Sequence, residues 1–140
     1  GCDQGREGWN PEMDREVLVN QMRQLERELR RQHGPVGLLM LVPLESWPDE
    51  AWTLLVSAKG VNRITRAEGI RQLVALLESV VDREIWSRVL RVAPLRTDDP
   101  FVAGVISRHP TRSVVDLQAL EIQGFVIPKA VLFTAKKVAA

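Results

Sequence analysis

The chain has 140 residues, of which 45% are hydrophobic, 26% charged and 5% aromatic, and its 19 basic and 18 acidic side chains give a formal net charge of +1. This length predicts one domain with its own hydrophobic core, which needs no disulfide or structural metal for stability. The near-neutral charge argues against a nucleic acid or an anionic membrane surface as the favoured partner. No apolar run approaches the roughly 18 residues of a transmembrane segment.

The polar, glycine-containing residues 1–9 predict a flexible leader in front of a single domain formed by residues 10–140. One cysteine, Cys2, cannot form an internal disulfide, which favours a cytoplasmic protein of bacterial type. An alternative stays open, because Gly-Cys followed by Asp-Gln-Gly resembles the end of a bacterial lipoprotein signal. In that case Cys2 would carry the lipid anchor of an exported protein.

A long helix is predicted from Pro11 to His33. Asn10 is a suitable N-cap, and Gly34 with Pro35 ends the helix. Its apolar residues follow helical spacing and form one narrow seam: Leu18, Met22, Leu25 and Leu29. Such a narrow seam on a helix of more than twenty residues matches either the protein's own sheet or a partner helix.

Two strands follow this helix. The run from Val36 to Val42 is almost wholly apolar and predicts a central strand buried on both faces. Residues 46–50 form a turn, and residues 52–58 alternate with the period of a strand. The two strands are expected to pair antiparallel.

A second, amphipathic helix is predicted after Thr65, whose hydroxyl caps it while Glu68 completes a capping box. A strand is expected from Val89 to Ala93, and the preceding Ile85 and Trp86 fit either a strand or a helix. A short third helix then opens at Asp99 and Pro100 and ends before His109, with Asp99 as its cap.

Residues 113–122 and 125–133 predict a closing hairpin around Gln123 and Gly124, and Pro128 suggests that the last strand is an edge strand or contains a bulge. The order αββαβαββ predicts an α+β single domain. Its sheet is expected to be mixed, mostly antiparallel and of about five strands, with the long N-terminal helix, the second amphipathic helix and the short third helix packed on it.

Motifs for catalysis, cofactors and metals are missing, so no catalytic, cofactor-binding or metal-binding residue is predicted. His33 and His109 lie far apart without further ligands at a suitable spacing, and no glycine-rich phosphate loop is present. Asp116 and Glu121 leave open an enzyme with an unrecognised acidic site, in which a lysine would have to converge with them in space. The candidate lysines are Lys129, Lys136 and Lys137.

The function expected from these features is that of a non-enzymatic protein that acts through protein contacts, in a regulatory or adaptor role and as a homodimer or with another protein partner. The candidate interface residues are the seam side chains Leu18, Met22, Leu25 and Leu29, together with Trp47, because tryptophan is enriched at binding hot spots. An alternative is a nucleic-acid-binding accessory protein. It would use the basic side chains of the first helix: Arg23, Arg27, Arg30 and Arg31.

Overall fold

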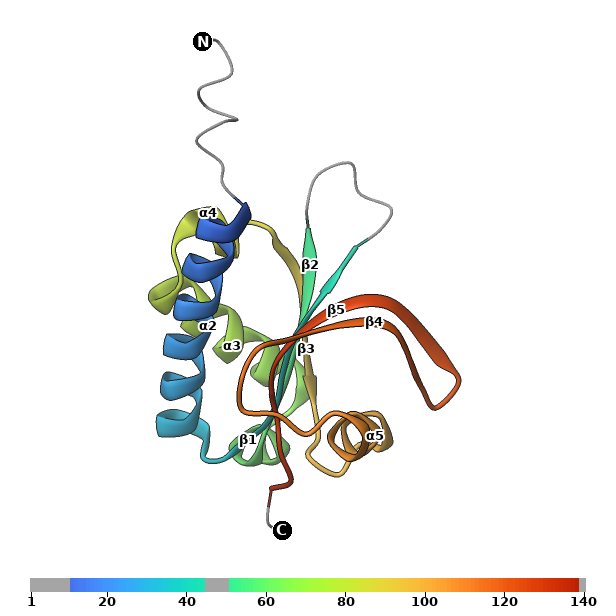
Figure 1. The fold of residues 1–140 in the computed structure, drawn as a ribbon. Coiled ribbons are helices and arrows are strands. Elements are labelled where there is room, and N and C mark those ends of the chain that lie inside the picture. The colour runs from blue at the N-terminus through green and yellow to red at the C-terminus, as the bar shows by residue number, and fades with distance from the viewer. Residues whose placement is uncertain (1–10, 45–50, 139–140) are drawn as a thin grey trace.

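The computed structural model describes residues 11–44 and 51–138, and it has the predicted α+β architecture with a five-stranded, mostly antiparallel sheet (Figure 1). The leader, Cys2, Asn10 and the turn that contains Trp47 lie outside the described residues. In chain order the elements are α2 (Pro11–His33), β1 (Val36–Pro43), β2 (Trp52–Ala58), the 3-10 helix η1 (Lys59–Arg63), α3 (Arg66–Val80), α4 (Arg83–Trp86), β3 (Val89–Leu95), α5 (Pro100–Arg108), β4 (Val115–Ile122) and β5 (Phe125–Ala135).

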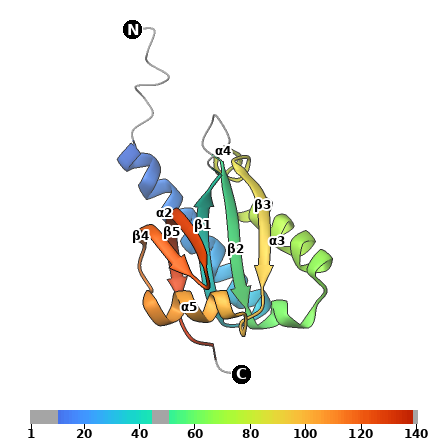
Figure 2. The ribbon, with the colours of Figure 1, turned by 90° about the vertical axis from the view of Figure 1, so that its right-hand side faces the viewer.

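The strands lie in the order β3-β2-β1-β5-β4, so the apolar strand β1 is central, as its composition predicts. β1 pairs antiparallel with both β2 and β5, and β4 pairs antiparallel with β5. β2 and β3 are parallel because α3 connects them by a crossover. β3 and β4 are therefore the two edges of the sheet (Figure 2).

Helices cover the two faces of the sheet unequally. α2 and α3, of 23 and 15 residues, lie on one face, whereas the nine-residue α5 crosses the lower part of the other (Figure 2). β1 contributes to both cores, since Leu39 and Leu41 pack in the cluster under α2 and α3, and Leu38 and Met40 pack in the cluster under α5. This two-sided burial accounts for the almost continuous apolar sequence of the strand.

The predicted N-caps Thr65 and Asp99 are present, with one correction. Thr65 Oγ1 accepts a hydrogen bond from the Glu68 backbone N–H at 3.1 Å, and Asp99 Oδ1 accepts one from the Phe101 N–H at 2.8 Å. The second hydrogen bond of the predicted capping box, from the Thr65 backbone N–H to the Glu68 side chain, is wrong. The Glu68 carboxylate instead accepts hydrogen bonds from the side chains of Arg71 and Gln72.

Element boundaries differ from the predictions where local hydrogen bonds decide them. Ile85 and Trp86, for which the sequence left a strand or a helix open, belong to the short helix α4. β4 begins at Val115 instead of Ser113, because the Thr111 hydroxyl accepts a hydrogen bond from the Ser113 N–H and holds this segment in a turn. β5 continues to Ala135, which exchanges two backbone hydrogen bonds of 2.9 Å with Thr111.

The β4–β5 hairpin turns at Gln123 and Gly124, whose φ values of 54° and 80° suit a two-residue hairpin turn. The sequence left two possibilities open for β5, an edge strand or a bulge. β5 lies between β1 and β4 and is not an edge strand, but its register with β1 shifts between the pairs Leu39–Thr134 and Met40–Leu132, as a bulge does. The pairing with β1 covers residues 131–135 of β5, however, and Pro128 lies beyond it. A proline is tolerated there because that part of β5 has β4 as its one neighbour, and no hydrogen bond to β1 is lost.

Candidate functional surfaces

The apolar seam of α2 is buried inside the protein's own core. Its four side chains are between 0 and 8% exposed and pack in one cluster with residues of β1, β2 and α3: Leu18, Met22, Leu25 and Leu29. The sheet and α3 thus occupy the surface that a partner helix would need. A binding surface of this protein has to be built from other side chains, and Trp47 lies outside the described residues.

The four arginines singled out on α2 are not equivalent. Arg23 is partly buried and donates hydrogen bonds to Glu26 at 2.9 Å and to Thr134 Oγ1 at 3.4 Å, so it stabilises the packing of α2 on the sheet. Arg30 lies 4.0 Å from the same glutamate. Arg27 is exposed and has no ion-pair or side-chain hydrogen-bond partner among residues 15–44 and 51–138.

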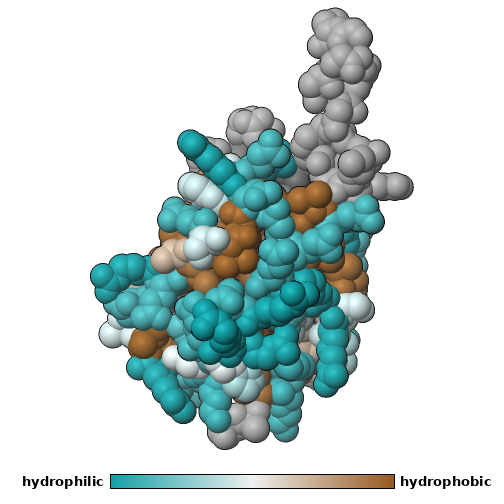
Figure 3. All heavy atoms as spheres, turned by 90° about the vertical axis from the view of Figure 1, so that its left-hand side faces the viewer, coloured by the Kyte–Doolittle hydropathy of each residue, from teal (hydrophilic) through white to brown (hydrophobic). Residues whose placement is uncertain are grey.

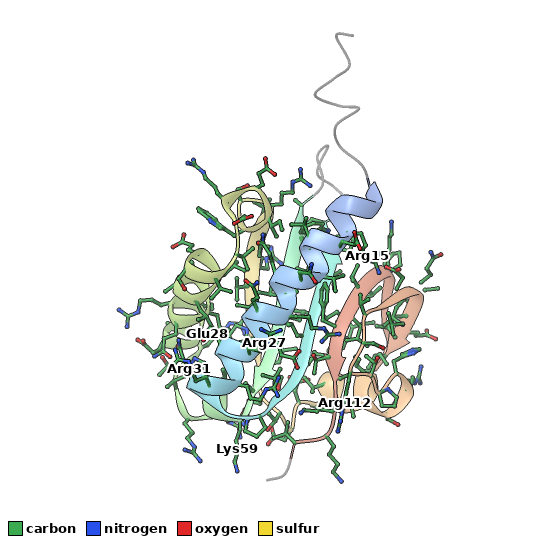
Figure 4. The ribbon with its side chains drawn as sticks, turned by 60° about the vertical axis from the view of Figure 1, so that its left-hand side comes forward. Arg15, Arg27, Glu28, Arg31, Lys59 and Arg112 are labelled. Carbon is green, nitrogen blue, oxygen red and sulfur yellow. The ribbon has the colours of Figure 1, made fainter. Side chains whose placement is uncertain are left out.

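Arg31 forms an exposed ion pair with Glu28, one turn earlier on α2. Arg31 Nη2 donates to Glu28 Oε1 at 2.6 Å, and Arg31 Nε also bonds the carboxylate. These hydrogen bonds hold the pKa of Glu28 below its ordinary value. Glu28 is therefore charged and neutralises Arg31 in part, whereas Arg27 has no such partner within the residues that the structure describes; Figure 4 shows where the three side chains lie.

Further cations from distant parts of the chain surround the C-terminal end of α2. The Lys59 N–H donates to the Pro35 carbonyl at 3.0 Å, and the Lys136 N–H donates to the Gly37 carbonyl at 3.0 Å, so both lysines flank the start of β1. Arg112 follows Thr111, which pairs with the end of β5. We call Arg27, Arg31, Lys59, Arg112 and Lys136 the basic end, and Figure 4 labels the first four of them.

The outer end of the β4–β5 hairpin is apolar and exposed. Phe125 and Val126 are 65% and 63% exposed, the highest values among the large hydrophobic side chains that the structure describes. The hairpin projects away from the helical layer (Figure 1). By contrast, hydrophilic side chains cover most of the side formed by α2 and α3, and the hydrophobic areas on that side are small and separate (Figure 3).

Among the described residues, neither acidic residue of β4 forms an ion pair with a lysine. Asp116 accepts a 2.7 Å ion pair from Arg15 of α2, which shows that its side chain lies on the α2 side of the sheet. At Glu121 the backbone carbonyl accepts a hydrogen bond from Arg108 of α5. No group of three or more His, Cys, Asp or Glu side chains suited to a metal ion is found in the part of the chain that the structure describes.

His33 is a buried residue at the end of α2. Burial lowers the pKa of its imidazole, and its Nε2 has no hydrogen-bond partner among the described residues. The backbone packs closely here, because a Cβ at Gly60 would lie 2.7 Å from the His33 carbonyl oxygen. His109 follows α5 and donates its backbone N–H to the Val105 carbonyl.

Sequence reasoning missed Phe125, Val126, Lys59 and Arg112. A signal for the first two was present, because residues 122–128 carry no charge and flank a two-residue turn, which places them at the end of a hairpin. Lys59 and Arg112 have no such signal. They lie 53 residues apart and are brought to the same end of the molecule by the strand pairing.

Among the residues described, no helix has the length and apolar character needed to cross a membrane. Comparison of the chain with protein-family models, with curated proteins and with solved structures finds no match.

Proposed function

We propose that the protein is a non-enzymatic binding protein that acts as a homodimer, in a regulatory or adaptor role, through the outer end of the β4–β5 hairpin. The observation that carries the proposal is the exposure of the neighbouring side chains Phe125 and Val126 at this end. Successive residues of a strand point to opposite faces, so each face of the hairpin end presents one large apolar side chain. Single exposed hydrophobic residues are ordinary, but two adjacent ones, one of them aromatic, offer a larger apolar area for a contact than a single residue does.

The charge distribution favours a second copy of the chain as the partner. Residues 122–128 contain no charged side chain, so two identical hairpin ends meet without like-charge repulsion.

The incompletely covered face of the sheet supplies the complementary surface. On the α5 side, the half-buried side chains Val42, Leu55 and Ile127 form the margin of the smaller core. A two-fold arrangement in which each hairpin end lies on this face of the other copy removes from water, in both copies, the apolar side chain that faces the partner. Isologous contacts of this kind are the usual basis of homodimers.

The test is the mass of the full-length protein in solution, measured by sedimentation equilibrium over a concentration series. We expect a dimer for the wild type, and for the double variant Phe125→Thr, Val126→Thr a dissociation constant raised at least about 100-fold, as for the loss of hot-spot side chains. Threonine is chosen because it keeps the β propensity of the hairpin.

The matched control is Leu90→Thr, which removes a 48% exposed apolar side chain from the opposite edge strand β3. This variant is expected to dimerise like the wild type. A wild type that stays monomeric at the highest concentration, or equal weakening by the hairpin and control substitutions, would refute the proposal.

A further inference from the structure

The basic end of the molecule carries more positive charge than the fold neutralises. Three carboxylates at or near this end are already paired: Glu28 with Arg31, Asp98 with Arg96, and Glu68 with Arg71. Arg27, Lys59 and Arg112, in contrast, have no ion-pair or side-chain hydrogen-bond partner in the described parts of the chain.

The stabilisation of the C-terminus of α2 by nearby cations explains only a part of the positive charge at the basic end. Cations in the last turn of α2 interact favourably with the partial negative charge of the helix C-terminus, which accounts for Arg30 and Arg31. Lys59, Arg112 and Lys136 belong to other elements, so this effect does not require them. They add positive charge at the ends of β2 and β5 and next to the start of β1.

The surroundings of these cations indicate what kind of anion they fit. The large hydrophobic side chains that are exposed in the described chain lie elsewhere: Val17 near the start of α2, Leu90 near the start of β3, and Phe125 and Val126 on the hairpin. The basic end thus lacks the apolar anchors that a membrane-surface segment uses, and it lacks the aromatic side chains on which single-stranded bases stack. A duplex, whose phosphates face outward, needs neither.

The exposed side of α2 adds hydrogen-bonding side chains to the cations. Asn20, Gln24, Arg27 and Arg31 follow one another at spacings of four, three and four residues and are all exposed. They therefore form one polar ridge along the outer side of the helix. Amide and guanidinium groups are common donors to phosphate oxygens, and the wide major groove of B-form DNA admits a helix, unlike the deep, narrow groove of duplex RNA.

We propose that the basic end binds double-stranded DNA through its phosphate backbone, without sequence preference, with Arg27, Lys59 and Arg112 as the principal contact cations. This surface is distinct from the hairpin end, and the proposal stands on charge placement rather than on the dimer. It revises the arginine set taken from the sequence, because Arg23 is engaged in the packing of α2 and the new members Lys59 and Arg112 lie outside that helix.

The test is a fluorescence anisotropy titration of a labelled 24-base-pair DNA duplex with the full-length protein at several salt concentrations. We expect a dissociation constant of about 10⁻⁴–10⁻⁶ M near physiological salt, with log K falling linearly as log salt rises. The triple variant Arg27→Gln, Lys59→Gln, Arg112→Gln is expected to bind at least about tenfold more weakly. Its salt slope should be smaller by about 2 to 3, since each lost phosphate contact reduces the slope by about 0.9.

A second triple variant removes the same charge from other parts of the surface: Arg83→Gln in α4, Arg91→Gln in β3 and Lys129→Gln in β5. All three positions are exposed. This control is expected to keep a salt slope within about one of the wild-type value, because non-contacting charges act over roughly a Debye length.

Three outcomes would overturn the proposal: no binding of the duplex at low salt, equal losses in the two triple variants, or tighter binding of duplex RNA or of vesicles containing phosphatidylserine than of DNA. In the hairpin variant Phe125→Thr, Val126→Thr, the basic end of each subunit should bind DNA as it does in the wild type. Failure of the dimer proposal is therefore distinguishable from failure of this one.

Discussion

Two apolar runs of this chain have opposite environments. The run in β1, from Val36 to Val42, is buried on both faces, whereas the run that begins β5 leaves Phe125 and Val126 exposed. β1 is the middle strand and has helices above and below it, but the first residues of β5 extend past β1 and have β4 as their one neighbour. Hydrophobic composition therefore predicts a strand, and the position of that strand in the sheet decides whether its side chains form core or surface.

The largest contrast should come from truncating one side chain in each run. Leu39 is fully buried, so Leu39→Ala is expected to lower the free energy of unfolding by about 2 to 5 kcal/mol through lost burial and cavity formation. Val126→Ala should change it by less than about 0.5 kcal/mol, as for surface substitutions in general. Urea denaturation of both variants measures the two values, and similar losses would show that the hairpin end is buried.

A smaller effect is expected where the hairpin meets α5. A Cβ at Gly104 would lie 2.6 Å from Ile122 Cγ2, so Gly104→Ala should destabilise the protein by about 1 to 3 kcal/mol through overpacking. Gly69 in α3 is the matched control, because its added Cβ would meet Pro94 at an ordinary 3.5 Å.

Gly69→Ala is expected to raise stability by about 0.5 to 1 kcal/mol, since alanine has the higher helix propensity. Thermal unfolding followed by circular dichroism measures both changes. Effects of the same sign in the two glycine variants would contradict the close contact between α5 and the inner half of the hairpin.

The cap of α3 tests the helical layer that covers β1. Thr65→Ala removes the side-chain acceptor of the Glu68 N–H and should cost about 1 kcal/mol. Thr65→Ser keeps the acceptor and is expected to stay within a few tenths of a kcal/mol of the wild type, as the urea midpoints of the two variants would reveal. Equal losses in both would assign the effect to the threonine methyl group instead of the hydrogen bond.

The smallest expected effect is a pH dependence at the end of α2. Burial lowers the pKa of His33, so the unfolded chain binds a proton at a higher pH than the folded protein does. The stability that neutral His33 contributes is complete above the pKa of the unfolded chain, about 6.5. It is lost as the pH falls from there toward the lower pKa of the folded protein. The urea midpoint should fall more steeply below pH 6.5 in the wild type than in His33→Gln, and identical profiles would contradict the shift.

The candidate surfaces were less predictable from the sequence than the fold. Local signals located α2, α3, α5 and the hairpin, since a cap such as Thr65 or a turn such as Gln123-Gly124 depends on residues that are near neighbours in the chain. The seam of α2 fitted a partner helix as well as the protein's own sheet, because periodicity identifies an apolar face without identifying what covers it.

The sequence by itself determined the fold class, the order of the elements and the buried character of β1, since these follow from hydrophobic periodicity and from capping and turn residues. The tertiary structure decided that the leucine seam is internal, that Phe125 and Val126 are surface, and that Lys59, Arg112 and Arg27 share one end of the molecule. The physical reason is that strand order and the packing of helices on the sheet join residues far apart in the chain, and such long-range contacts leave no local pattern in the sequence.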